Sequence, residues 1–133
     1  IGFVAANKTL EILKKDKINK KLVKIGKEVR NSWLNISKES NVPIDVFGQY
    51  SMPGFVFKKN HRLLSTFFTQ EMLKRGYLAG SQVSTTSAYN KNIINKYLKE
   101  VDQVFGKIKF FLEKGKFPLR GEIKHSTFRR LTG

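Results

Sequence analysis

The side chains that could do chemistry outside the predicted helices gather in one polar segment, residues 81–87, with the sequence SQVSTTS. Its hydroxyls and its amide donate and accept hydrogen bonds but do not titrate near neutral pH. One interpretation is that Ser81 and Gln82 form the rim of a substrate pocket, because binding residues are often carried on loops. The other is a solvated connection whose hydroxyls cap the helix that follows.

The chain offers few groups for acid–base, nucleophilic or metal chemistry. It has no cysteine, and its two histidines, His61 and His125, stand far apart without a suitably spaced Asp or Glu. Most acidic residues, Glu71 and Glu100 among them, fall between lysines at helical spacing, as on a solvated helix face. Phosphate-binding glycine loops, nucleophile elbows and zinc-protease motifs are missing from the sequence. We therefore predict no catalytic, cofactor-binding or metal-binding residue in this chain.

The positive charge has two interpretations. The chain carries 26 Lys and Arg against 10 Asp and Glu, a formal charge of +16. A lysine-rich composition can follow from a bias in the coding sequence, whereas a clustered basic surface attracts nucleic acid or another polyanion. The lysines are spread over every predicted helix, without a basic–aromatic recognition motif. A nucleic-acid partner is therefore the less favoured alternative.

Length and composition are those of one folded domain. The 133 residues are 40% hydrophobic and include 11 Phe, which is ample apolar material for one core. No apolar run is long enough to span a membrane, and no signal peptide opens the chain. The lack of cysteine fits a reducing compartment. We expect a cytoplasmic protein with no membrane partner, and the apolar opening residues suggest a fragment of a longer chain.

Hydrophobic spacing predicts helices around a small sheet. Apolar residues recur every three to four positions in four segments, 3–15, 17–40, 60–75 and 90–114. Two short strands joined by a turn are predicted within residues 44–57. Residues 77–79, continued by 82–84, are candidates for further strands. The predicted fold class is α+β, a small and mostly antiparallel sheet of three to four strands covered by helices on one side.

Four stretches carry a family resemblance through their order and spacing. Residues 1–13 form an Ala-containing helical pattern, and residues 48–57 a hairpin pattern. Residues 67–79 contain MLKRGYLA, and residues 87–98 open with SAYN before a helix. Together they resemble the C-terminal small domain of fold-type I, class III pyridoxal-phosphate (PLP) aminotransferases, within the glutamate-1-semialdehyde 2,1-aminomutase-like branch. The matching family patterns are ML.RG..L and S.AHT...I.

This resemblance implies that residues 1–115 are the small domain of a larger homodimeric enzyme, the parent. Residues 1–15 would be the helix that leads in from an upstream large domain of the same chain. That large domain would hold PLP through a lysine that precedes Ile1, so the present chain alone is expected to be catalytically inert.

The resemblance also implies where this chain meets the reaction. Ser81 and Gln82 would lie nearest the mouth of the active site, facing a small amino-acid or amino-sugar-type substrate. Tyr89 stands where the aminomutases have His, and Asn90 where they have Thr. Whether the amino group moves within one molecule or between two is therefore left open.

The remaining residues, 116–133, are predicted to be a basic C-terminal tail. The arginines at 120, 129 and 130 offer forked donors for phosphate, or the segment serves as a solubilising or docking tail. The alternative to an aminotransferase domain is a basic nucleic-acid-binding or protein-interaction module. The large apolar residues in the opening segment are the reason to consider a protein-interaction module, because they would suit a protein interface.

Overall fold

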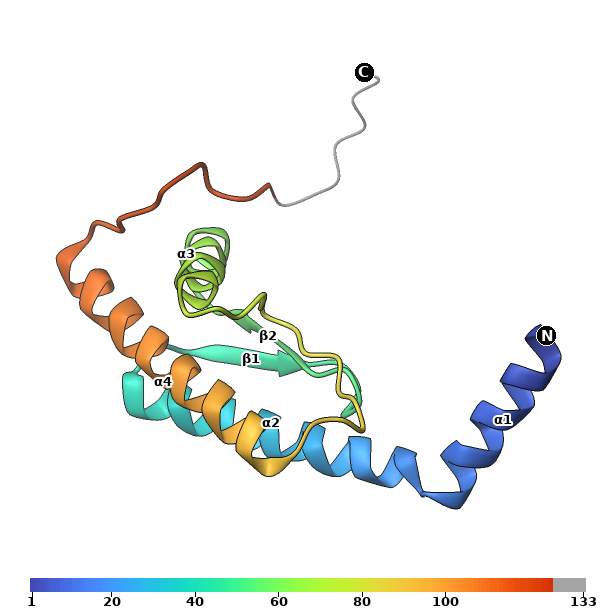
Figure 1. Cartoon of the computed structure of the whole chain (residues 1–133). Helices are drawn as coiled ribbons and strands as arrows, with labels where there is room; N and C mark the ends of the chain where they lie inside the picture. Colours follow the sequence, from blue (N-terminus) through green and yellow to red (C-terminus); the bar gives the residue numbers. More distant parts are fainter. Residues whose placement is uncertain (126–133) are drawn as a thin grey trace.

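Four helices and a two-stranded sheet make up the part of the chain that the computed structural model describes, residues 1–125 (Figure 1). In chain order they are α1 (Gly2–Lys15), α2 (Ile18–Ser40), β1 (Ile44–Phe47), β2 (Gly54–Phe57), α3 (His61–Lys74) and α4 (Lys91–Lys114). The α+β class and the four predicted helices are confirmed. The predicted tail residues 126–133 lie outside the described part.

The strands β1 and β2 form an antiparallel hairpin with one face toward the helices. The pairs Ile44↔Phe57 and Val46↔Phe55 place four apolar side chains on the inner face, where all but the half-buried Val46 are buried. Asp45 lies on the opposite face and is exposed. The alternation of apolar and polar residues in β1 therefore sets which face meets the core.

The sheet has two strands, so the prediction of three to four was wrong. Residues 77–84 run beside β2 in extended form but join it through a single bridge, Gly54↔Gln82. The candidate strands 77–79 and 82–84 are consequently parts of one extended segment that lies at the edge of the hairpin.

A proline explains why one bond of this pairing is missing. The bridge is flanked by backbone hydrogen bonds from Phe55 N to Ser81 O, at 2.8 Å, and from Val83 N to Pro53 O, at 2.9 Å. The next bond of an antiparallel ladder would run from the N–H of Pro53 to the carbonyl of Val83, and proline has no N–H. That one bond is therefore missing, although the pairing continues beyond it, where Thr85 N donates to Ser51 O at 3.0 Å.

The hydrophobic core is built around Phe55. Its ring centroid lies 5.0 Å from that of Trp33 on α2, 5.3 Å from Phe68 on α3 and 5.8 Å from Phe105 on α4, all in edge-on geometry. All four side chains are fully buried. One strand residue thus contacts three helices. Each aromatic pair contributes about 0.5–1.5 kcal/mol of stability beyond the contribution of the buried area.

The first part of the predicted tail packs along α3. The ring of Phe117 lies 5.1 Å from that of Phe67. The side-chain amide of Gln70 donates to Pro118 O at 3.0 Å and accepts from Arg120 N at 2.7 Å. Residues 116–125 contain neither helix nor strand, so side-chain contacts hold this segment in place.

The helix α1 projects away from the rest of the domain (Figure 1) and has no buried residue. Ile1, Phe3 and Val4 are strongly exposed. The helical conformation is interrupted between α1 and α2 at Asp16 and Lys17, where the hydrophobic spacing predicted an interruption. Lys17 has a φ of 50° there. Within residues 1–125, no helix has the length and apolar character needed to cross a membrane.

Candidate functional site

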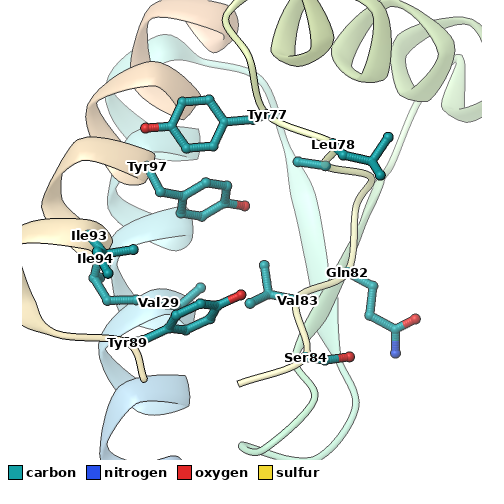
Figure 2. A pocket seen from close by; sticks show the side chains of 11 residues that line it. Val29, Tyr77, Leu78, Gln82, Val83, Ser84, Tyr89, Ile93, Ile94 and Tyr97 are labelled. Atoms are coloured by element: carbon teal, nitrogen blue, oxygen red, sulfur yellow. The ribbon is translucent and has the colours of Figure 1, made fainter. Parts of the chain in front are cut away.

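A cavity of about 480 Å³ lies between α2, α4 and the extended segment 77–84 (Figure 2). We call it the tyrosine pocket, after the residues that shape it: Val29, Tyr77, Tyr89, Ile94 and Tyr97. Val29, Ile94 and Tyr97 are buried and form its floor, whereas Tyr77 and Tyr89 are half-buried. None of its lining residues carries a charge.

The end of α3 directs the chain into the wall of this pocket. Gly76 has a φ of 81°, a left-handed conformation that glycine adopts at little cost. Its N–H donates to Leu73 O at 2.9 Å, and the N–H of Tyr77 donates to Met72 O at 3.0 Å. This pair of bonds is the Schellman motif, which ends α3 close to the predicted end of the 60–75 segment and starts residues 77–84 in extended form.

The start of α4 places the opposite wall. The Asn90 side-chain oxygen accepts from Ile93 N at 3.0 Å, so Asn90 is the N-cap of α4, at the predicted start of this helix. Tyr89 therefore stands just outside the helix, while Ile94 and Tyr97 occupy its first turns and face the core. The segment SAYN thus positions a tyrosine at the mouth of the pocket.

The two predicted rim residues fall on opposite sides of the extended segment. Half-buried and exposed residues alternate along residues 77–84, with Ser81 on the inner side and Gln82 on the outer side. Gln82 contributes to the pocket lining, but its amide points away from the three tyrosines (Figure 2). The role of Ser81 and Gln82 at an active-site mouth stays a prediction.

Two buried polar atoms beside the pocket have no hydrogen-bond partner among the described residues. They are the hydroxyl of Tyr97 and the indole nitrogen of Trp33. Burial raises the pKa of the Tyr97 hydroxyl well above its usual value; the nearby Trp33 N–H opposes this, although the two groups do not reach hydrogen-bond geometry. Tyr97 is therefore a neutral donor at physiological pH. Tyr97 falls within the apolar repeat of the predicted 90–114 helix, and no local signal separates it from its apolar neighbours.

A buried carboxylate links α3 to α4. Glu71 Oε2 accepts from Lys107 Nζ at 2.8 Å and lies 3.3 Å from Arg75, while Lys74 pairs with the other oxygen. Arg75 also binds Glu100 on α4, at 3.0 Å. Burial alone would raise the pKa of Glu71, but hydrogen bonds from the three cations outweigh it and lower the pKa to about 2.

This arrangement corrects the interpretation of Glu71 as part of a solvated face, since only 3% of its side chain is exposed. Lys107 lies on a different helix, so local spacing could not show that it reaches Glu71. A carboxylate bound by three cations has no free oxygen pair for acid–base work. Glu71 is a structural residue.

The histidines take no part in a metal site in the described structure. His61 Nδ1 lies 3.3 Å from Ser65 Oγ on the same helix, and His125 is exposed at the end of the described range. Within residues 1–125, no three His, Asp or Glu side chains gather closely enough to hold a metal ion.

Comparison with known proteins shows that the chain is similar to parts of two longer proteins. No protein-family model matches the chain. It is 28% identical over 116 residues to a 3-aminobutyryl-CoA aminotransferase from Cloacimonas acidaminovorans (strain Evry), an alignment that covers 77% of this chain and 28% of that protein. Its fold matches the FumI protein of Sphingopyxis sp. MTA144, solved in the PLP internal aldimine form, with a TM-score of 0.74 at 18% identity.

Both relationships concern only a part of those proteins. The structural match covers 87% of this chain and 28% of the FumI chain. The chain therefore spans less than a third of the length of either protein. Neither comparison extends to the glutamate-1-semialdehyde aminomutase subtype. In sequence and in fold, the chain is similar to a part of larger proteins, one of them named as an aminotransferase and the other solved with PLP.

Proposed function

We propose that this chain is the C-terminal small domain of a class III PLP-dependent aminotransferase, and that it covers the substrate side of an active site whose cofactor is held elsewhere in the parent. The fold match carries this proposal, because 87% of the chain is matched within a much longer PLP protein at a TM-score of 0.74. The parent would be a cytoplasmic homodimer acting on a small substrate with an amino group.

Transfer of the amino group between two molecules is the reaction we favour over a shift within one. The support is the aminotransferase relative, which is named for 3-aminobutyryl-CoA. Tyr89, which replaces the histidine of the aminomutases, lies at the wall of the tyrosine pocket. The aminomutase subtype would require that replacement to be without effect on the reaction.

The described residues do not fit PLP themselves. PLP supplies the carbanion chemistry, and the protein must provide a lysine for attachment, a carboxylate facing the pyridine nitrogen and a cradle for the phosphate. The tyrosine pocket has no charged lining residue, and the buried carboxylate of Glu71 is bound to three cations. We therefore assign cofactor binding to the parent's upstream domain and derive no reaction step through this chain.

The helix α1 offers a surface for that upstream domain. Ile1, Phe3 and Val4 are exposed, and a helix of this kind gains most of its stability from packing of its apolar face. A large domain of the same chain would bury these side chains. The same surface in the isolated chain is expected to promote self-association.

The deciding experiment is the visible absorption spectrum of the full-length parent incubated with PLP, before and after borohydride reduction. We expect the parent to show the absorption band of bound PLP, and reduction to attach the cofactor irreversibly to one lysine upstream of Ile1. The present chain alone should retain no cofactor after reduction and show no transaminase turnover. A chain that turned over substrate by itself would contradict the proposal. A parent that bound no PLP would refute the proposed family and favour the alternative of a basic nucleic-acid-binding module. For such a module, the logarithm of the affinity for nucleic acid should fall linearly with the logarithm of the salt concentration.

A further inference from the structure

We propose that the tyrosine pocket is a binding site for an uncharged aromatic molecule that carries a hydrogen-bond acceptor such as a carbonyl oxygen. The cavity of about 480 Å³ is within the range of small-molecule sites, which are mostly apolar with few polar groups. This inference goes beyond the proposed function, because it needs neither PLP nor an upstream domain.

The aromatic walls favour a flat guest. The rings of Tyr77 and Tyr97 lie 6.0 Å apart between centroids, tilted by 57°, and Tyr89 lies nearby in the same lining (Figure 2). Aromatic rings attract one another in offset or edge-on contacts at such distances. Tyr77 and Tyr97 already contact each other, so a guest ring in the cavity would pack beside this pair and could contact more than one tyrosine.

The lack of charge in the lining selects a neutral guest. The chain carries a formal charge of +16, yet none of the residues that line the tyrosine pocket is charged. Moving an ion from water into an uncharged apolar site is costly unless the site supplies a partner charge. A carboxylate would therefore gain more from the lysine-rich surface than from this pocket.

The unpartnered hydroxyl gives the site its polar anchor. Tyr97 is 8% exposed, and its hydroxyl is buried without a hydrogen-bond partner. Figure 2 shows the hydroxyls of Tyr97 and Tyr89 directed toward the extended segment that bears Val83, which is the space a guest would fill. An acceptor on that guest would satisfy the Tyr97 O–H, which otherwise stays unpaired at a cost.

Benzamide and benzoate form a matched pair of probes, with the same ring and different charge. Trp33 reports on binding because it is the single tryptophan of the chain and lies in the same buried region as Tyr97. We expect benzamide to change the Trp33 fluorescence and the indole N–H resonance saturably, in the millimolar range. Benzoate should bind at least about fivefold more weakly, although the chain is strongly positive.

Two variants separate the pocket from unspecific binding. Tyr97→Phe keeps the ring and should weaken benzamide binding about 3- to 10-fold, as loss of one neutral hydrogen bond predicts. It should fold, because the hydroxyl it removes has no protein partner. Tyr50→Phe, at an exposed ring stacked on Lys27 and Arg30, should leave the affinity unchanged.

Several results would overturn the proposal. Benzoate binding as tightly as benzamide would show that charge and not the pocket drives binding. Equal affinities of Tyr97→Phe and Tyr50→Phe would show that the Tyr97 hydroxyl makes no contact with the probe. Binding by the present chain but not by the full-length parent would show that the pocket is filled by the parent's own residues. Because the titration uses no cofactor, each failure leaves the proposed function standing.

Discussion

Replacement of Glu71 by Gln tests how the α3–α4 pair is held together. The carboxylate is 3% exposed and accepts from Lys107, Lys74 and Arg75, so the one negative charge that these three cations share at this site would be lost. Gln keeps the size of the side chain and one acceptor oxygen. The substitution therefore removes charge with little change in packing.

The magnitude follows from the pKa. The pKa of Glu71 falls from 4.5 to about 2 in the folded chain. At 1.36 kcal/mol per pKa unit, the ionised form contributes about 3 kcal/mol to the free energy of unfolding. Because the pKa is lowered by folding, this contribution is fully present above about pH 5, declines as the pH falls toward 2, and is absent below both pKa values.

Urea unfolding at pH 7, 4 and 2.5 measures this directly for the unmodified chain and for Glu71→Gln. The difference in free energy of unfolding should be about 3 kcal/mol at pH 7 and shrink toward zero at pH 2.5. Glu11→Gln is the matched control, because Glu11 is an exposed residue paired only with Lys8 on the same helix. A difference that stayed the same at all three pH values would refute the reasoning, since the loss would then come from packing and not from ionisation.

Further predictions concern glycines and a helix cap. Gly26→Ala should destabilise by about 1–3 kcal/mol or more, because a Cβ there would lie 1.5 Å from the carbonyl oxygen of Tyr50. Gly106→Ala, also inside a helix but with open space around its Cα, should stabilise by about 0.5–1 kcal/mol; thermal unfolding of both variants checks the pair, and equal shifts would contradict the close approach. Asn90→Ala should cost about 0.5–2 kcal/mol by leaving Ile93 N without its partner; Asn90→Ser should recover most of this loss in urea unfolding, and failure to do so would exclude capping as the cause.

The helices were predictable because their signals are local. Apolar residues at helical spacing, an N-cap at Asn90 and left-handed glycines at Gly76 and Gly115 all act within a few residues of the chain. The same local signals place both walls of the tyrosine pocket. Two of the four stretches that carry the aminotransferase resemblance contain these helix ends, the end of α3 and the start of α4.

The features that were missed depend on contacts between distant segments. Whether residues 77–84 extend the sheet depends on the backbone bonds that they make to residues 53–55, not on the β-propensity of the residues themselves. The burial of Glu71 depends on Lys107 from another helix. A pocket around Tyr97 exists only once α2, α4 and residues 77–84 are assembled. The hydrophobic spacing within one segment carries no information about such contacts between segments.

The partial attachment of residues 77–84 to the hairpin has a mechanical consequence. A continuous strand would form backbone hydrogen bonds between the pocket wall and the hairpin at every second residue, so that the two would move as a rigid unit. Instead, the wall is attached near Ser81 and Val83, while the stretch from Tyr77 to Gly80 makes no ladder bond to β2. That stretch is held at both ends, by the bond from Tyr77 N to Met72 O and by the bonds of Ser81 and Val83, so its middle can shift and change the width of the cavity without the breaking of any bond in the sheet.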